Sequence, residues 1–185
     1  MPTKTLSVDD KVSRFDRIVY YRLFFIVATI AVVFDRGTKW IVQKTIPYGT
    51  YDPASMIEVI PNFFYICHIG NTGAAWGMFH NQSLPLALFS LVALFLLYVF
   101  RKSLGLRSIQ VQFALGMVTG GILGNLYDRL VFKHVVDFLD FHLGFYRWPA
   151  FNIADSCILI GVLLFCYYSF QEEAKRKAEE RELGE

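Results

Sequence analysis

Charged residues are scarce over most of this chain, and their absence leaves long apolar runs. Asp, Glu, Lys and Arg make up 18% of the 185 residues and apolar residues 55%, whereas soluble domains average about 25% charged and about 45–50% apolar residues. The mean hydropathy is +0.40. This composition argues against a soluble domain and predicts an integral membrane protein, and the chain length fits a single domain.

Metal-binding motifs, a full set of cysteine pairs and clusters of basic residues are also lacking. The four histidines have no H-E-x-x-H or comparable spacing, so we predict no metal and no cofactor. Cys67, Cys157 and Cys166 cannot form a closed disulfide set, and we expect free, buried thiols. The formal net charge is only +2 and the basic residues form no patch, which argues against a nucleic-acid partner.

Four long apolar segments lie at about 18–35, 84–100, 109–128 and 153–170. Each approaches the roughly 20 residues that a helix needs to cross the hydrocarbon core of a bilayer. No small-x-small cleavage site follows the first segment, so we expect a retained helix there rather than a removed signal peptide. The sequence therefore predicts four transmembrane helices.

Lys and Arg are distributed unevenly between the loops. Eleven of them fall in the 40 positions of 1–17, 101–108 and 171–185, but only six fall in the 74 positions of 35–83 and 128–152. Because short loops rich in Lys and Arg stay in the cytoplasm, we predict that both termini are cytoplasmic. The mixed charges of 171–185 are typical of a solvated, helical tail.

The segment between the first and second predicted helices favours β-structure. Residues 45–83 combine β-branched and aromatic side chains with Pro61 and an Asn-Thr-Gly cluster, a pattern typical of short strands bounded by turns. The fold predicted for residues 1–185 is accordingly a single membrane domain of the all-α class. It is a four-transmembrane-helix bundle with a small extracytoplasmic β-sheet in residues 40–83.

Three acidic residues fall near the outer ends of three predicted helices. Asp35 closes the first helix, Asp128 closes the third, and Asp155 lies in the first turn of the fourth. Ionisable groups in transmembrane segments are costly and by default mark a functional site. We therefore expect the three carboxylates to converge in one layer of the bundle.

Several of these polar residues also have a purely structural interpretation. Lys39 follows Asp35 at the i,i+4 spacing that favours an ion pair, Asp128 stands next to Arg129, and Asn152 is a suitable N-cap for the fourth helix. A stripe of small residues in the third helix indicates close helix packing. Its members are Gly116, Gly120 and Gly124.

The Asn-x-x-Asp spacing occurs twice. Asn125 lies three residues before Asp128 on one helical face, and Asn152 lies three residues before Asp155. Two such faces that meet would form a pair of carboxylates flanked by amides. A helix N-terminus favours an anion and a C-terminus disfavours it, so we hypothesise that Asp155 is ionised and Asp128 protonated.

Five stretches of the chain stand out together, namely DRGTK (35–39), NTGAAWG (71–77), GGILGNLYDR (120–129), VVDFLDF (135–141) and FNIADSCI (151–158). In these residues and in this order the chain resembles the bacterial lipoprotein signal peptidases, type II, which are aspartic proteases of the cytoplasmic membrane. The apolar exchanges at Trp76, Ile122 and Leu123 depart from the family's usual residues and affect the shape of a pocket rather than its chemistry.

The resemblance implies an activity and a set of site residues. It implies an inner-membrane endopeptidase that removes the signal peptide from diacylglyceryl-modified prolipoproteins, cutting on the N-terminal side of the modified Cys. Asp128 and Asp155 would hold the attacking water near the outer face. We expect a monomer in contact with membrane lipid. The residues assigned to substrate binding or positioning are Asp35, Lys39, Asn71, Gly73, Trp76, Asn125, Arg129, Asp137 and Asn152.

Two functions of other classes are weighed against the protease. A small carrier would use the acids to bind a proton or cation, but carriers usually show repeated halves and broken helices at the bilayer midplane, and no internal repeat appears here. A scaffold would use the acids only for internal pairing. Cleavage of a lipid-modified precursor by the purified protein separates the three functions.

Overall fold

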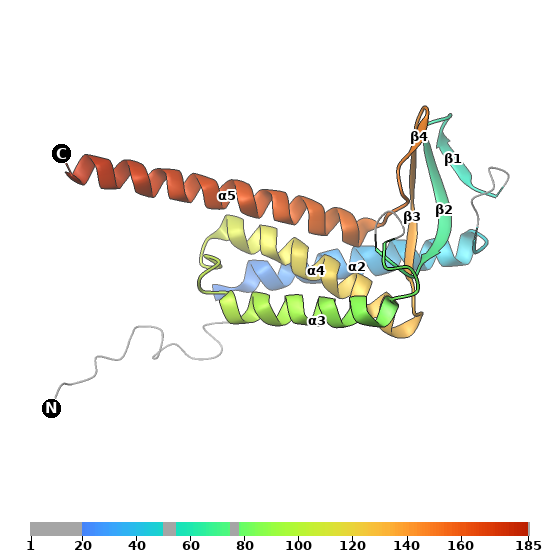
Figure 1. Cartoon of the computed structure of the whole chain (residues 1–185), viewed down its shortest axis with the longest axis horizontal. Helices are drawn as coiled ribbons and strands as arrows, with labels where there is room; N and C mark the ends of the chain where they lie inside the picture. Colours follow the sequence, from blue (N-terminus) through green and yellow to red (C-terminus); the bar gives the residue numbers. More distant parts are fainter. Residues whose placement is uncertain (1–19, 50–54, 75–77, 185) are drawn as a thin grey trace.

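The helices of the described chain run side by side, and a small sheet lies across one end of the bundle (Figure 1). The structure is a computed structural model that describes residues 20–49, 55–74 and 78–184. Its helices and strands, in chain order, are α2 (Arg22–Thr45), β1 (Ile57–Ile60), β2 (Phe64–Asn71), α3 (Ser83–Phe100), α4 (Ile109–Val131), β3 (Val135–Leu143), β4 (Tyr146–Arg147) and α5 (Ile153–Gly184).

The central helix is α4, which packs against α2, α3 and α5. Its glycines make this possible, because a Cβ on Gly120 would lie 2.6 Å from the carbonyl oxygen of Ala28 in α2, and one on Gly121 would overlap the carbonyl of Ala154 in α5. Gly116 likewise abuts α2. The predicted packing role of the glycine stripe is therefore confirmed for Gly116 and Gly120, and small residues bring the backbones close together.

Three helices of the described chain are long and apolar enough to cross a membrane, namely α3, α4 and α5. Among the described residues, α2 does not join them because Asp35, Arg36 and Lys39 interrupt its apolar sequence. Length and composition thus support three of the four predicted spans among the described residues.

The first helix is longer than the sequence predicted. The prediction ended it at Asp35, where the apolar run stops, but α2 continues to Thr45. The charges do not end the helix, because Lys39 turns inward and pairs with Asp35 at 2.8 Å. Beyond them, Val42 and Ile46 are buried against β3. The predicted end at residue 35 is therefore wrong.

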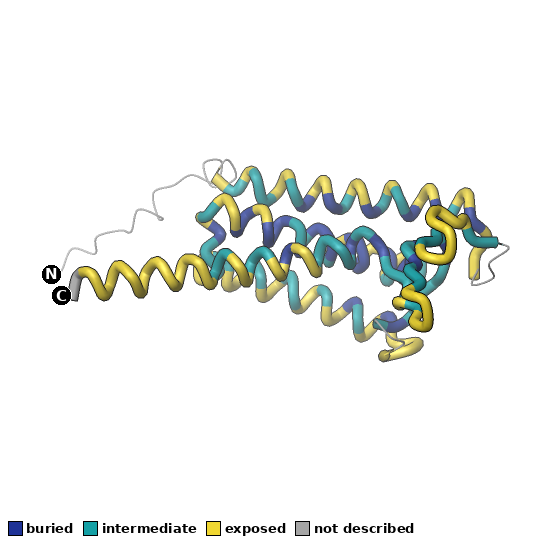
Figure 2. Tube along the Cα trace, turned by 90° about the horizontal axis from the view of Figure 1, so that it is seen from above, coloured by how far each residue is buried: buried dark blue, intermediate teal, exposed yellow. Residues whose placement is uncertain are grey.

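The last helix continues through the charged tail without a break. It extends beyond the bundle with most of its residues exposed (Figure 2), and two i,i+4 ion pairs, Arg176 with Glu180 and Lys177 with Glu173, lie along it. The prediction of a solvated helical tail is confirmed.

The three cysteines are free, but Cys166 on this helix is exposed, so the expectation of buried thiols is wrong for that residue.

The sheet is larger than predicted. Its order is β1-β2-β3-β4, and each neighbouring pair is antiparallel. Only β1 and β2 fall within 40–83; β3 and β4 come from the segment between α4 and α5, for which no strand was predicted. The first half of β3 is buried at every position, so it lacks the polar alternation by which a half-buried strand is recognised.

The residues just before α5 extend the pairing of β3. Leu139 and Phe151 exchange two backbone hydrogen bonds of 2.8 and 3.1 Å. On the other side of β3, Asp137 pairs with Ile69 of β2. This bridge holds the first turn of α5 next to the middle of β3, at the end of the bundle where α2 and α4 also arrive (Figure 1).

Candidate active site

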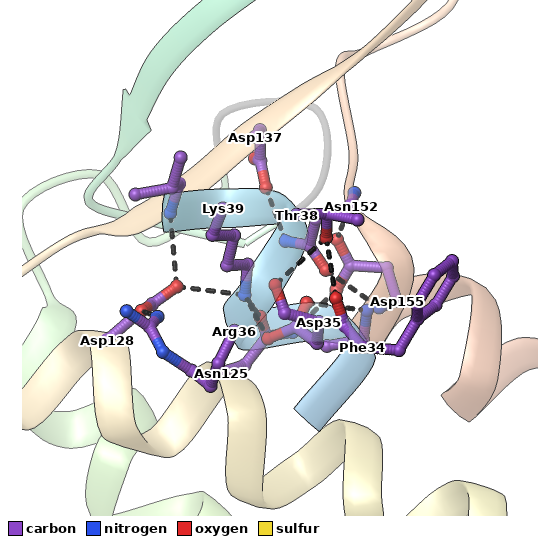
Figure 3. Close-up of polar contacts among 12 residues, drawn as sticks. Phe34, Asp35, Arg36, Thr38, Lys39, Asn125, Asp128, Asp137, Asn152 and Asp155 are labelled. Atoms are coloured by element: carbon purple, nitrogen blue, oxygen red, sulfur yellow. Dashed lines mark hydrogen bonds and ion pairs between the residues drawn. The ribbon is translucent and has the colours of Figure 1, made fainter. Parts of the chain in front are cut away.

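Four carboxylates gather where the helices meet the sheet (Figure 3). Asp35 comes from α2, Asp128 from α4, Asp137 from β3 and Asp155 from α5. Asp35 and Asp128 have no exposed surface, and Asp137 is 2% exposed. Burying a carboxylate is costly unless it is paired or hydrogen-bonded, so the partners of each acid indicate what it can do.

Lys39 is the hub of this cluster. Its ammonium Nζ lies 2.8 Å from Asp35 Oδ2 and 2.8 Å from Asp128 Oδ2, and it donates a hydrogen bond of 3.0 Å to Asn125 Oδ1. The side chain is fully buried. Since an ammonium has three protons to donate, Lys39 has an acceptor for each of them.

Asp128 is held by two cations and by the backbone of β3. The guanidinium of Arg36 donates to Asp128 Oδ1, Lys39 contacts Oδ2, and the N–H of Val136 donates to Oδ2 at 3.3 Å. Arg36 is itself stacked over the ring of Tyr127, with 4.4 Å between its Cζ and the ring centroid. Asp128 therefore ties α2 and α4 to the start of β3.

Asn152 and Asp155 cap the N-terminus of α5 reciprocally. The N–H of Asp155 donates to Asn152 Oδ1 at 2.9 Å, and the N–H of Asn152 donates to Asp155 Oδ2 at 3.2 Å, which is the geometry of a capping box. The next free backbone donor, the N–H of Ala154, bonds Asp35 Oδ1 at 3.0 Å. The predicted N-cap role of Asn152 is confirmed.

Asp137 and Asp155 are surrounded by amides rather than by cations. Asn71 and Asn152 donate side-chain N–H groups to Asp137 at 3.0 and 2.7 Å, and Asn125 donates one to Asp155 Oδ1 at 2.7 Å. Asn152 therefore contacts both acids. Within the described residues, neither acid forms an ion pair.

Burial, followed by the negative charge of Asp155, raises the pKa of Asp137 to about 7. The hydrogen bonds from Asn71 and Asn152 oppose this rise only in part. The cluster contains four carboxylates and three cations, the cations being Arg36, Lys39 and Arg129. A single proton on the Asp137–Asp155 pair would make the cluster neutral, and two carboxylates this close cannot easily both be ionised.

A cavity of about 690 Å³ opens beside the amide-bound acids. Its polar lining includes Asn125, Arg129, Asp137 and Asp155, whereas its walls are apolar residues of α5, β3 and the segment between β4 and α5. Arg129 also donates a hydrogen bond of 3.4 Å to the carbonyl oxygen of Gly73, after β2. The cavity thus places two carboxylates beside apolar walls.

The structure places the predicted site residues together, but in another arrangement. The predicted ion pair between Asp35 and Lys39 is confirmed, and Trp76 lies outside the described residues. Asp128 and Asp155 lie on opposite sides of the cluster (Figure 3), and Lys39 and Asn125 lie between them. Their pairing stays a prediction.

Asp137 was assigned only a positioning role from the sequence. It lies between the apolar Val135 and Leu139 on one face of β3, and a polar residue inside a buried strand is a signal that points to a site. That signal was missed because the strand itself was not predicted.

Comparisons with known proteins agree on one family. A family model described as signal peptidase (SPase) II matches residues 27–171. The lipoprotein signal peptidase of Desulforapulum autotrophicum is 40% identical over 149 residues, covering 77% of this chain and 88% of that one. The lipoprotein signal peptidase of Anoxybacillus flavithermus is 34% identical over 155 residues, covering 84% and 89%.

Solved structures agree with this. A bacterial membrane enzyme solved by the in meso method at 2.3 Å resolution is similar with a TM-score of 0.73, 32% identity and coverage of 82% of this chain and 90% of that one. A second one, at 1.9 Å resolution, has a TM-score of 0.68 and 34% identity. The sequence match, the shared fold and the buried carboxylates together establish that the chain belongs to the signal peptidase II family of membrane-bound aspartic proteases that process lipoproteins.

Proposed function

We propose that this chain removes the signal peptide from diacylglyceryl-modified prolipoproteins, cutting on the N-terminal side of the modified Cys, with Asp137 and Asp155 as the catalytic pair. The observation that carries the proposal is that both acids line the cavity and both contact Asn152. Asp128, the partner predicted from the sequence, is instead neutralised by Lys39 and Arg36 and is not among the lining residues.

The two acids differ in the way that peptide hydrolysis requires. Asp155 accepts hydrogen bonds from the backbone N–H of Asn152 and the amide of Asn125 at the N-terminus of α5, and these donors favour its anion. Asp137, with its raised pKa, carries the proton. Asp155 is therefore the ionised acid, as the helix-dipole argument predicted, but its protonated partner is Asp137 rather than Asp128.

Hydrolysis then proceeds by proton transfer between the pair. Asp155 accepts a proton from a water as the oxygen of that water attacks the scissile carbonyl, and Asp137 donates its proton to the substrate, so a neutral tetrahedral intermediate forms. When the C–N bond breaks, the leaving nitrogen takes the proton from Asp155, and a hydroxyl group of the intermediate returns a proton to Asp137 as the carboxyl product forms. The departing amine is the N-terminus of the lipid-modified Cys, and the pair again holds one proton.

The apolar walls of the cavity suit a substrate that stays partly in the bilayer. Residues of α3, α4 and α5 line it below the sheet, among them Ser90, Ile122 and Leu159. The diacylglyceryl group can therefore remain among lipid chains while the peptide bond beside it reaches the acids. The hydrogen bond from Arg129 to the carbonyl of Gly73 fixes the segment after β2 over the same cavity.

We further propose that α2 is a fourth span and that the sheet lies outside the cell. Its 24 residues extend roughly 36 Å, enough to cross the hydrocarbon core, and its charges Asp35 and Lys39 face inward with no exposed surface. With four spans, the excess of Lys and Arg in the loop 101–108 and the tail places both termini in the cytoplasm. The active site then lies near the outer face, and the chain acts as a monomer.

The test combines turnover with stability. The purified chain in detergent is incubated with a diacylglyceryl-modified precursor, and Asp137→Asn, Asp155→Asn and Asp128→Asn are compared by release of signal peptide and by thermal unfolding, with exposed Glu58→Gln as control. We expect Asp137→Asn and Asp155→Asn to abolish turnover. Asp137→Asn should keep stability close to that of the wild type, because a neutral amide replaces a carboxyl group that is itself protonated and neutral in the native protein.

Asp128→Asn should behave differently because it leaves the buried Lys39 and the half-buried Arg36 short of a partner. Breaking a buried ion pair in this way costs roughly 3–5 kcal/mol, so its main effect should be a large loss of stability. The proposal is overturned if Asp137→Asn still cleaves the precursor, or if Asp128→Asn is as stable as the wild type and inactive. The second result would restore the pairing predicted from the sequence.

A further inference from the structure

A second cavity lies at the other end of the bundle, between α2, α3 and α4. Its volume is about 460 Å³, within the range of about 300–1,000 Å³ that is usual for ligand sites. It shares no lining residue with the active-site cavity. Most of its lining is apolar or aromatic, including Phe24, Leu97 and Leu115.

The walls of this second cavity are fixed by packing on α4. Leu106, Val111 and Leu115 form a buried cluster at its base, against which Phe24 and Leu97 pack. Both α2 and α3 pack on α4, but they make few contacts with each other. The gap between α2 and α3 is therefore a groove, and residues of α4 close its base.

An arginine lies at the mouth of the groove. Arg101 follows the last residue of α3, stacks over the ring of Tyr98 at 4.4 Å from the centroid, and donates a hydrogen bond of 2.7 Å to the carbonyl of Tyr98. No described carboxylate forms an ion pair with it. Arg101 is the one charged residue among the residues described as lining the groove, so it gives the mouth a positive charge.

We propose that the groove binds an anionic glycerophospholipid, with the phosphate at Arg101 and one acyl chain along Phe24, Leu97 and Leu115. The leaflet is the one at the end of the bundle remote from the sheet. Basic pockets between transmembrane helices recognise anionic headgroups in this way. A signal peptide is a poorer occupant, because its own start is positively charged and Arg101 would repel it.

The experiment measures lipid retention by the full-length protein. Native mass spectrometry of the chain in detergent, titrated with phosphatidylglycerol or with phosphatidylcholine of the same acyl chains, gives the affinity for each lipid. We compare Arg101→Gln, which removes the charge at the mouth, with Arg176→Gln, which removes the same charge from the exposed tail of α5. A third variant, Leu97→Trp, fills the groove.

We expect one phosphatidylglycerol per chain, retained in preference to phosphatidylcholine. Arg101→Gln should weaken its binding by roughly fivefold, Leu97→Trp should abolish it, and Arg176→Gln should leave it unchanged. Equal affinity for the two lipids would mean exchangeable boundary lipid only, and an unchanged affinity in Arg101→Gln would remove the headgroup site. A lipid-free dimer would assign the groove to a second copy; each of these three results overturns the proposal.

Discussion

Replacing Lys39 by Met tests whether one buried ammonium holds the cluster together. Methionine keeps most of the length and the apolar stem of lysine but removes the charge and its three N–H donors. In the native protein these donors face Asp35 and Asp128, each at 2.8 Å, and Asn125 at 3.0 Å. The substitution therefore leaves two buried carboxylates and one amide oxygen short of a partner.

The expected cost follows from those contacts. Removing one partner of a buried ion pair typically destabilises a protein by roughly 3–5 kcal/mol, and the absence of exposed surface at Lys39, Asp35 and Asp128 means that solvent screens little of it. Asp128 keeps Arg36, so the loss should stay in this range rather than double. At about 2–4 °C per kcal/mol for a chain of this size, the unfolding temperature should fall by roughly 6–20 °C.

The assay is thermal unfolding of the purified protein in detergent, followed by circular dichroism. Lys44→Met, on an exposed position of the same helix, is the matched control and should change little. Combining Lys39→Met with Asp35→Asn should cost less than the sum of the single changes, because the two residues interact directly. If the free energy of unfolding of Lys39→Met is within about 0.5 kcal/mol of the wild-type value, as for surface substitutions, the cluster does not stabilise the fold and the reasoning fails.

Two further outcomes are expected. Turnover should fall as the pH rises through about 7, because Asp137, whose pKa is raised by burial and then by Asp155, loses the proton that the pair needs; a pH–rate profile that is flat across neutrality would contradict this. Gly124→Ala should lower stability by about 1–3 kcal/mol, since its Cβ would lie 2.5 Å from Asp35 Oδ2. Gly37→Ala, whose Cβ meets nothing within 4 Å, should cost far less in the same unfolding assay.

Much of the helical framework could be predicted from the sequence, because a bilayer demands long apolar runs. The bounds predicted for α3 and for the start of α5 agree with the structure to within a residue. The end of α2 could not be predicted in this way. In the sequence, Asp35 and Lys39 indicate the end of a membrane segment. In the folded protein their charges pair inside the bundle, and this pairing cannot be predicted from local sequence.

The catalytic partner that we propose for Asp155 could not be chosen from the sequence for a similar reason. Both Asn-x-x-Asp stretches look alike as spacings, yet one is a capping box within α5 and in the other both polar side chains contact Lys39. Only the pairing of β3 with Phe151 brings Asp137 next to the start of α5. Local sequence patterns do not predict this contact, because it joins two segments that are separated along the chain.

The attachment of α3 to the rest of the bundle has a mechanical consequence. This helix packs on α4 and supplies Ser90 to the cavity wall, but it contributes none of the four carboxylates. A tilt of α3 would widen the cavity without disturbing the acids. The chemistry thus resides in a rigid frame while one wall can yield, an arrangement suited to cutting precursors of differing bulk at a fixed bond.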